Sequence, residues 1–405
     1  MTHSPAIQRT RSGRSRAASA ARLLALVATV VLVVAACGGG AKSTTPESVQ
    51  AAKTALDRQK LPDWVHKPPI GDVKTRGNVG ESPTWYSDVT LSDQDLQTIR
   101  SKRYKAAFLN WDSSAYNQAI YQGAKDAFEA MGVNVVAETN YKFNSAQLQT
   151  DVLNVMALQP DILLYSGVNP VSDRAAFQPA IRAGASIVSY ANAPGDWTTG
   201  RPKNFVTLIS YDTFGMGAAV ADEVHKQFPN GANLGAIYFA ADYKLVNERE
   251  KGFFDQLAKY PNLKLVAKEP MTDPYKTQDI ATAMIARHPD INVVFAPWDL
   301  PAEGVSAALD AAGRKDVKIA SIDLGFTGAR QIASGGHIFV EGSDLVYEWG
   351  RTGAIAAALH LLGKPVPPYI VVPVSAVTKK TLKDGWTLAY GPHVPLPPEV
   401  VKALG

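Results

Sequence analysis

Between Tyr104 and Ile322, short apolar runs alternate with longer amphipathic stretches. The apolar runs predict strands that are buried on both faces, and the stretches between them have the apolar spacing of helices. Parallel strands need long crossover connections, and a helix after each strand supplies one. The chain is therefore expected to be an α/β protein built on parallel sheets.

The pattern predicts the following strands and helices. The strands are expected over residues 104–109, 133–138, 161–165, 186–190, 204–208, 233–239, 263–267, 292–296 and 318–322. The helices are expected over residues 115–131, 146–158, 173–183, 214–228, 246–259, 276–287, 302–312 and 328–334.

About nine such units could close into one barrel or form two lobes. A segment rich in Gly, Pro and Asp, from Asn192 to Pro202, interrupts the series after four units and is typical of a crossover between domains. We therefore predict two doubly wound, Rossmann-like parallel-sheet lobes joined by a hinge, with the barrel as the alternative. The predicted organisation is a signal peptide (1–36), a flexible tether (37–46), an N-terminal extension (47–100), lobe 1 (101–193 plus 344–366), lobe 2 (194–343 plus 367–390) and a C-terminal tail (391–405).

The N-terminus has the features of an export signal. Five Arg and no acidic residue occur in residues 1–22, and an uncharged apolar run, Leu23–Ala36, leads to Cys37. The run is shorter than the roughly 20 residues that span a membrane. The small residues before Cys37 resemble a bacterial lipobox, so Cys37 is predicted to carry the lipid. The alternative is an uncleaved anchor helix with a buried cysteine.

Removal of this segment changes the charge of the protein. The whole chain has 41 Lys plus Arg against 37 Asp plus Glu, and loss of the five Arg leaves 36 basic residues and a formal charge of −1. No Lys/Arg cluster remains elsewhere, which argues against a nucleic-acid partner.

No catalytic motif stands out. The sequence has neither a GxxxxGK[ST] phosphate loop nor a GxSxG nucleophile elbow, and its seven His show no metal-ligand spacing. We therefore predict no catalytic residue, no metal and no cofactor, although a triad can assemble from distant positions.

Polar and aromatic side chains instead follow the predicted strands. In open parallel sheets, ligands bind beyond the carboxyl ends of the strands. Asp, Asn and Arg can bond pairs of sugar hydroxyls, and aromatic rings can cover the C–H faces of a sugar. The residues found in these loops are Trp111, Asp112, Ser113, Ser114, Tyr116, Asn117, Asp173, Asn192, Asn247, Arg249, Trp298, Asp299 and Asp323.

Several of these residues also have a purely structural explanation. Ser113 and Asp173 could cap helices, and Arg249 could form a structural salt bridge. Trp111 and Trp298 could belong to the core, because large aromatic residues are mostly buried. The shared location of these residues at strand ends therefore carries the inference.

The region from about residue 103 to 380 resembles the ribose-binding-protein branch of type I periplasmic binding proteins, the receptors of sugar ABC importers. The matching motifs are Ser114-Ala115-Tyr116-Asn117 before Gly123-Ala124, Asn169-Pro170 ahead of Asp173, Arg249-Glu250-Lys251-Gly252-Phe253, Trp298-Asp299, Ser321-Ile322-Asp323, and a long helix over 344–363 that ends in Gly363-Lys364-Pro365.

The resemblance assigns binding roles to the first-loop residues Ser113, Ser114, Tyr116 and Asn117, and to Asp173 and Asp323. It places Asn247 where ribose receptors carry a binding Arg, Trp298 where they carry Asn, and Asp344 where they carry Gln. Because of these departures, the resemblance implies a monosaccharide other than ribose, or a sugar alcohol.

The resemblance further implies a monomeric binding protein that is not an enzyme and that traps its ligand by hinge closure. It would be exported, lipid-anchored to the outer face of the cell membrane, and would deliver its ligand to an ABC permease. One alternative is a lipoprotein that presents its ligand to a membrane receptor kinase, and another is a secreted carbohydrate-active hydrolase. A DNA-binding regulator of this fold would need a helix-turn-helix where residues 1–40 carry the export signal.

Overall fold

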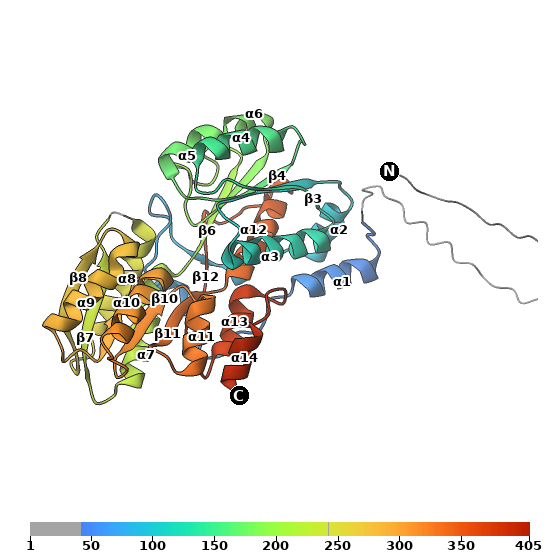
Figure 1. Ribbon diagram of the computed structural model, residues 1–405. Helices are drawn as coiled ribbons and strands as arrows, with labels where there is room; N and C mark the ends of the chain where they lie inside the picture. Colours follow the sequence, from blue (N-terminus) through green and yellow to red (C-terminus); the bar gives the residue numbers. More distant parts are fainter. Residues whose placement is uncertain (1–41, 242) are drawn as a thin grey trace, which may run out of the picture. The chain divides into compact units, whose positions relative to one another are not determined.

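The computed structural model describes residues 42–241 and 243–405, which build two open sheets with helices packed on them (Figure 1). Two open sheets confirm the predicted two-lobed α/β fold and exclude the single barrel. The predicted signal peptide and the lipidated Cys37 lie outside the described residues.

The seven-stranded sheet belongs to lobe 1, and its neighbouring strands are all parallel. In spatial order its strands are β1 (Thr84–Trp85), β12 (Tyr369–Val372), β6 (Phe205–Tyr211), β5 (Ser186–Tyr190), β4 (Ile162–Ser166), β2 (Lys105–Asn110) and β3 (Asn134–Asn140).

The six-stranded sheet belongs to lobe 2 and is parallel except for its antiparallel edge strand β13. In spatial order its strands are β13 (Val374–Thr378), β11 (Ile338–Asp344), β10 (Lys318–Ile322), β9 (Val293–Phe295), β7 (Ala232–Phe239) and β8 (Leu263–Met271).

Helices connect most of these strands. They are α1 (Pro46–Leu56), α2 (Asp93–Arg100), α3 (Ala115–Met131), α4 (Ser145–Met156), α5 (Pro170–Ala176), α6 (Gln178–Ala183), α7 (Thr213–Gln227), α8 (Lys244–Leu257), α9 (Thr277–Arg287), α10 (Asp299–Ala311), α11 (Phe326–Ser334), α12 (Val346–Leu361), α13 (Leu382–Tyr390) and α14 (Pro398–Leu404), with short 3-10 turns at Ile70–Asp72, Tyr86–Asp88 and Pro274–Lys276.

Strand β2 shows why lobe 1 has helices on both faces of its sheet. Ala106 and Phe108 belong to the core cluster that contains residues of α3 and α12. Ala107 and Leu109 belong to a second cluster, which contains residues of α4. Successive side chains of a strand point to opposite faces, so an uninterrupted apolar run needs cover on both sides.

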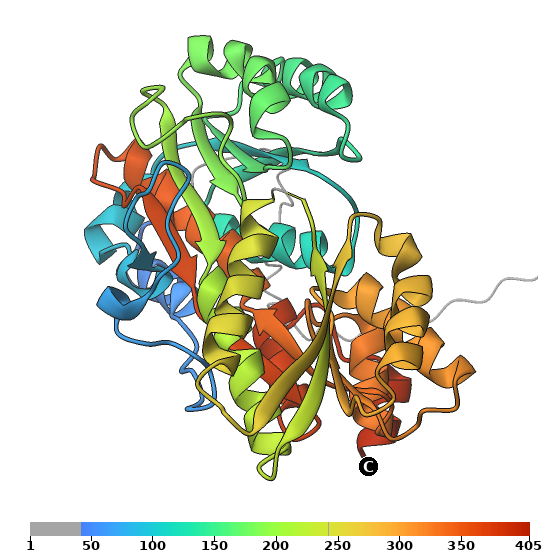
Figure 2. The same cartoon turned by 90° about the vertical axis from the view of Figure 1, so that its left-hand side faces the viewer.

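The predicted boundary between the lobes is wrong. Strand β6 was expected in lobe 2, as was the region of β12, but both lie in the lobe 1 sheet, side by side in Figure 2. All seven residues of β6 are buried, so it fits between two other strands rather than at a sheet edge. The segment Asn192–Pro202 thus returns to the same sheet. Within the described residues, the lobes are joined by β6–α7, β11–α12 and β12–β13.

Two local predictions also fail. The helix expected over residues 173–183 is divided into α5 and α6 at Phe177. Pro179 follows two residues later, and a proline ring clashes with the carbonyl four residues before it, which breaks a helix. The helix expected from Asp344 begins at Val346, because Asp344 is the last residue of β11.

The N-terminal extension contacts both lobes. Its strand β1 pairs with β12 in lobe 1, whereas His66 pairs with Val374 of β13 in lobe 2 through a backbone bond of 2.7 Å. The predicted C-terminal tail contains α14, which packs against α11 and buries Val400. Both segments are therefore integral parts of the fold.

Candidate functional site

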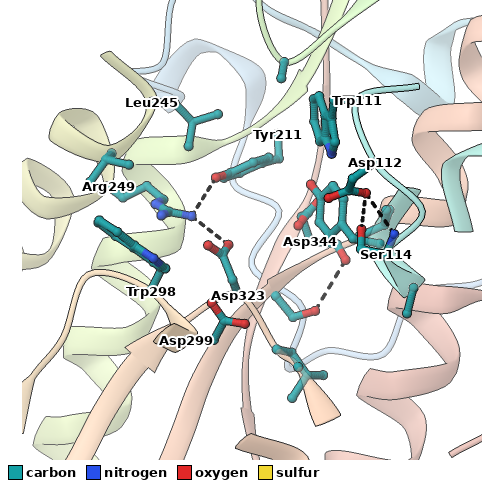
Figure 3. Close-up of a pocket in the computed structure, with 18 of the residues that line it drawn as sticks. Trp111, Asp112, Ser114, Tyr211, Leu245, Arg249, Trp298, Asp299, Asp323 and Asp344 are labelled. Atoms are coloured by element: carbon teal, nitrogen blue, oxygen red, sulfur yellow. Dashed lines mark hydrogen bonds and ion pairs between the residues drawn. The ribbon is translucent and has the colours of Figure 1, made fainter. Parts of the chain in front are cut away.

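A cavity of about 1130 Å³ lies where the carboxyl ends of the strands of both sheets face each other (Figure 3). Trp111 follows β2, Trp298 follows β9 and Asp323 follows β10, while Asp344 ends β11. Nine of the predicted residues line its wall: Trp111, Asp112, Ser114, Tyr116, Arg249, Trp298, Asp299, Asp323 and Asp344.

On the side of lobe 1, the Asp112 carboxylate is held by the first turn of α3. Its Oδ1 accepts hydrogen bonds from the Ser114 backbone N–H at 2.9 Å, the Ser114 hydroxyl at 2.7 Å and Asn117 Nδ2 at 2.7 Å. The Ser114 side chain in turn accepts from the backbone N–H of Asn117 and caps the helix. The carboxylate is thus fixed at the cavity wall before any ligand arrives.

On the side of lobe 2, a buried guanidinium organises the wall. Arg249 Nη1 lies 2.7 Å from Asp323 Oδ1 and donates to the Tyr211 hydroxyl at 3.1 Å, while Nη2 donates to the Pro297 carbonyl at 3.1 Å. Arg249 is only 3% exposed, whereas the Asp323 side chain is 34% exposed. The acid rather than the base is therefore the more accessible member of the pair.

The Asp323 backbone adopts an unusual conformation. Its φ of 69° lies in the left-handed region, which Asp tolerates better than most residues. Such positions cluster at binding sites, where the surrounding structure holds the strain in place.

Close helix packing positions Arg249. A Cβ on Gly217 of α7 would lie 1.8 Å from the Arg249 carbonyl oxygen, and a Cβ on Gly252 of α8 would lie 2.0 Å from the Phe214 carbonyl oxygen. Only glycine allows α7 and α8 to approach this closely, and this approach sets where α8 presents its guanidinium.

Two further acids of the wall hold protons more tightly than usual. Burial, followed by the nearby Asp323 charge, raises the pKa of Asp344 to about 7. The same two causes raise the pKa of Asp299 to about 6. The Tyr116 hydroxyl of lobe 1 donates to Asp344 Oδ2 of lobe 2 at 3.3 Å, so one hydrogen bond links the lobes across the site.

Aromatic rings cover much of the remaining wall. The Trp111 ring is stacked beside those of Tyr116 and Phe143, with each pair of centroids 6.4 Å apart. Trp298 lies edge-to-face with Phe239 at 5.3 Å. The sequence analysis did not include seven aromatic residues of the wall, namely Phe143, Tyr211, Phe239, Tyr243, Phe326, Trp349 and Tyr390.

A signal for two of these residues was present in the sequence. Phe239 is the last residue of β7 and Tyr211 the last residue of β6, so the rule of strand ends applies to both. The β6 strand was expected to end at residue 208, which hid Tyr211. Trp349 and Tyr390 lie on helices α12 and α13, where that rule gives no signal.

Contrary to the prediction, five residues lie outside the cavity wall. Ser113 is exposed, and Asn117 is fully buried behind Asp112. Asp173 is fully buried and accepts from the Tyr165 hydroxyl and from Ser145 Oγ, the latter at 2.7 Å, so its role is structural.

The other two of the five are Asn192 and Asn247. Asn192 lines a second, much smaller pocket. Asn247 Oδ1 accepts from the Tyr243 backbone N–H at 2.8 Å at the start of α8. It therefore holds the helix end rather than facing the cavity.

Among residues 42–241 and 243–405, no group of three or more His, Cys, Asp or Glu is arranged to hold a metal ion. No helix in this described part of the chain is long and apolar enough to cross a membrane.

Residues 106–365 match a family model described as a periplasmic binding protein domain. The chain is 23% identical over 303 residues to the ribose import binding protein RbsB of Escherichia coli (strain K12), covering 75% of this chain and 100% of that protein. It is 35% identical over 144 residues to the D-apiose import binding protein of Paraburkholderia graminis, covering 31% of this chain and 44% of that protein.

Solved structures share the fold. The arabinose binding protein AraP from Geobacillus stearothermophilus has a TM-score of 0.63 at 18% identity, covering 70% of this chain and 99% of that chain. A solute binding protein from Actinobacillus succinogenes, solved with bound D-allose, has a TM-score of 0.59 at 20% identity, covering 70% of this chain and 100% of that chain.

Proposed function

Because the chain belongs to the periplasmic binding protein domain family, we propose that it captures a monosaccharide or sugar alcohol between its two lobes and delivers it to an ABC importer. The cavity between the two sheets carries the proposal, because its wall combines carboxylates, a guanidinium and aromatic rings. The names of the ribose and D-apiose import binding proteins support the same ligand class.

The chemistry of the wall suits polyhydroxylated ligands. Asp112 and Asp323 are acceptors for hydroxyl donors, and each is already oriented by protein hydrogen bonds. Trp111 and Trp298, from opposite lobes, offer flat apolar surfaces to the C–H faces of a sugar ring. A ligand that lacks a hydroxyl would leave a carboxylate unpaired, at a cost of roughly 1–3 kcal/mol.

The proposed action is a hinged trap without chemistry. The ligand docks on lobe 2, where Arg249 and Asp323 are already paired, and then contacts lobe 1. Contacts to both lobes exist only when the lobes are close together, so the bound ligand shifts the population toward the closed form. The closed form, as a monomer, then docks on the permease.

The export signal supports attachment to the outer face of the cell membrane through a lipid on Cys37. Metabolic labelling with a radioactive fatty acid tests the anchor. The wild-type protein should be labelled and membrane-bound, and Cys37→Ser should be neither.

A thermal-shift screen across pentoses, hexoses and polyols, followed by calorimetry, tests ligand capture. Asp323→Ala should abolish binding of any hit, because it removes a hydroxyl acceptor, while leaving the circular dichroism spectrum unchanged. Unchanged affinity in this variant would remove Asp323 from the site.

Recovery of the ligand separates a receptor from a hydrolase, because a receptor returns its ligand unaltered. Uptake of the labelled ligand into cells, with and without the gene, separates importer from sensor. A ligand-sensing lipoprotein would leave uptake unchanged, which would contradict delivery to an importer.

A further inference from the structure

The cavity wall carries an excess of negative charge. Among the described residues that line it, Arg249 is the one cationic side chain, against Asp112, Asp299, Asp323 and Asp344. Arg249 already pairs with Asp323 at 2.7 Å. Three carboxyl groups therefore face the cavity without a cationic partner.

The protein satisfies these three groups to different degrees. Asp112 accepts from Ser114 and Asn117, which stabilises its charged form. Asp299 accepts from the Leu300 backbone N–H at 2.8 Å. The side-chain partner of Asp344 is the Tyr116 hydroxyl at 3.3 Å, although Asp344 is only 3% exposed. The acid with the weakest hydrogen bond is thus also deeply buried.

Aromatic rings surround Asp344. Tyr116 lies edge-to-face with Trp349 at 5.9 Å, and the Tyr211 ring lies 5.7 Å from the Trp349 ring. All three rings line the same cavity. A carboxylate among aromatic rings is a favourable environment for an organic cation, because the ring faces attract positive charge and the acid neutralises it.

A neutral ligand would make this arrangement costly. Closure of the lobes removes water, so carboxylates without a cation would either repel one another or take up protons. The raised pKa of Asp344, about 7, and that of Asp299, about 6, have this origin. Behind them, the fully buried Glu341 accepts from the Gly325 N–H at 3.4 Å, and burial together with Asp299 raises its pKa well above the ordinary value.

We propose that the ligand is an amino sugar or amino polyol whose protonated amine binds beside Asp344 within the rings of Tyr116, Tyr211 and Trp349. This inference rests on the proposed capture of a sugar or polyol. The hydroxyls of the ligand lie against Asp112 and the Arg249–Asp323 pair, and its amine supplies the cation that the wall lacks.

Calorimetry at pH 6, where alkylamines are protonated, tests the inference with matched ligands. The panel consists of 2-amino-2-deoxyhexoses, their N-acetyl derivatives, the parent hexoses, 1-amino-1-deoxyalditols and putrescine. The expected result is that an amino sugar or aminoalditol binds roughly 10- to 100-fold more tightly than its neutral counterparts. Tighter binding of the parent hexose would overturn the inference and leave sugar capture standing.

Two other outcomes test both proposals. Binding of putrescine without any sugar or polyol would support a cation site but overturn the proposed function. A panel in which no compound raises the melting temperature or releases heat would overturn both.

Variants test where the amine binds. Asp344→Asn should lower the affinity for the amine at least tenfold while changing the affinity for its neutral parent much less. Asp384→Asn removes the same charge from an exposed position on α13 and should change neither affinity. Equal losses for amine and parent in Asp344→Asn would overturn the assignment of the amine to this carboxylate.

Discussion

Arg249 on α8 and Asp323 after β10 form an ion pair of 2.7 Å within a single lobe. Half of the ligand wall is therefore assembled before the lobes meet. The guanidinium also donates to Tyr211 and to the Pro297 carbonyl, so three bonds fix its plane. Rigid placement of this kind reduces the ordering cost of binding.

The first prediction concerns this guanidinium. Arg249→Lys should lower ligand affinity by roughly 10- to 100-fold, because a single ammonium cannot reproduce the fork of bonds to Asp323, Tyr211 and Pro297. Calorimetry with the best ligand of the panel measures the loss. Lys251→Met on the same helix is the control, since it breaks an exposed pair with Asp255 that contributes about 0–1 kcal/mol. Equal affinities of Arg249→Lys and wild type would show that Arg249 does not orient the site.

A second prediction concerns the glycine contact between α7 and α8. Gly217→Ala should reduce both stability and ligand affinity, because its methyl group would meet the Arg249 carbonyl oxygen and force the helices apart. We expect a loss of several kcal/mol in the free energy of unfolding, measured by urea denaturation. Gly71→Ala, with no atom within 4 Å of the added methyl group, should change stability by less than about 1 kcal/mol. Similar curves for both variants would contradict this packing argument.

The third prediction concerns the attachment of the N-terminal extension. The Thr75 hydroxyl donates to Asp212 Oδ1 at 2.8 Å and accepts from the Phe214 N–H at 3.1 Å, at the start of α7. Both Thr75 and Asp212 are buried. Thr75→Val keeps the shape but leaves these groups unpaired, so we expect a loss of about 1–3 kcal/mol and faster amide exchange at Phe214.

Thr98→Val is the control for this prediction, because the Thr98 hydroxyl bonds to its own helix at an exposed position. If the two valine variants unfold at the same urea concentration, the Thr75 contact does not stabilise the extension.

The sequence predicted strand–helix units well because each predicted strand is an apolar run that needs cover on both faces. Strands β5 and β10 were predicted at their observed bounds. The lobe boundary could not be predicted, because the pairing of β6 with β5 and β12 depends on contacts between distant segments. The family resemblance and fold class are confirmed by the matching family model and by the two sheets.

The candidate site was predictable where it lies at strand ends. Asp112, Asp299 and Asp323 were found in this way, and all three line the cavity. Asp173 also follows a strand, yet it faces the protein interior, where Tyr165 and Ser145 use its oxygens. Side-chain direction after a strand end depends on the turn, and a single sequence does not reveal it. Whether the nine lining residues bind a ligand stays a prediction.

The last prediction concerns stability and pH. Asp344 has a pKa of about 7 in the folded protein, against 3.8 for an ordinary Asp, because of its burial and of the nearby Asp323. Between these two values the unfolded chain loses the proton first, so the folded state binds more protons and its stability falls as pH rises. Below pH 4 both states are protonated, and above pH 7 the penalty is constant. Asp344→Asn removes this penalty, which amounts to at most about 4 kcal/mol.

The melting temperature of Asp344→Asn should therefore equal that of the wild type near pH 4 and exceed it at pH 8. Part of the decline should persist, because Asp299, whose pKa is about 6, is still present. Scanning calorimetry without ligand, in steps from pH 4 to 8, measures the difference. Asp384→Asn should follow the wild-type curve, since its side chain is exposed. Parallel curves for wild type and Asp344→Asn across this range would mean that the Asp344 carboxyl is solvated rather than buried in the folded protein.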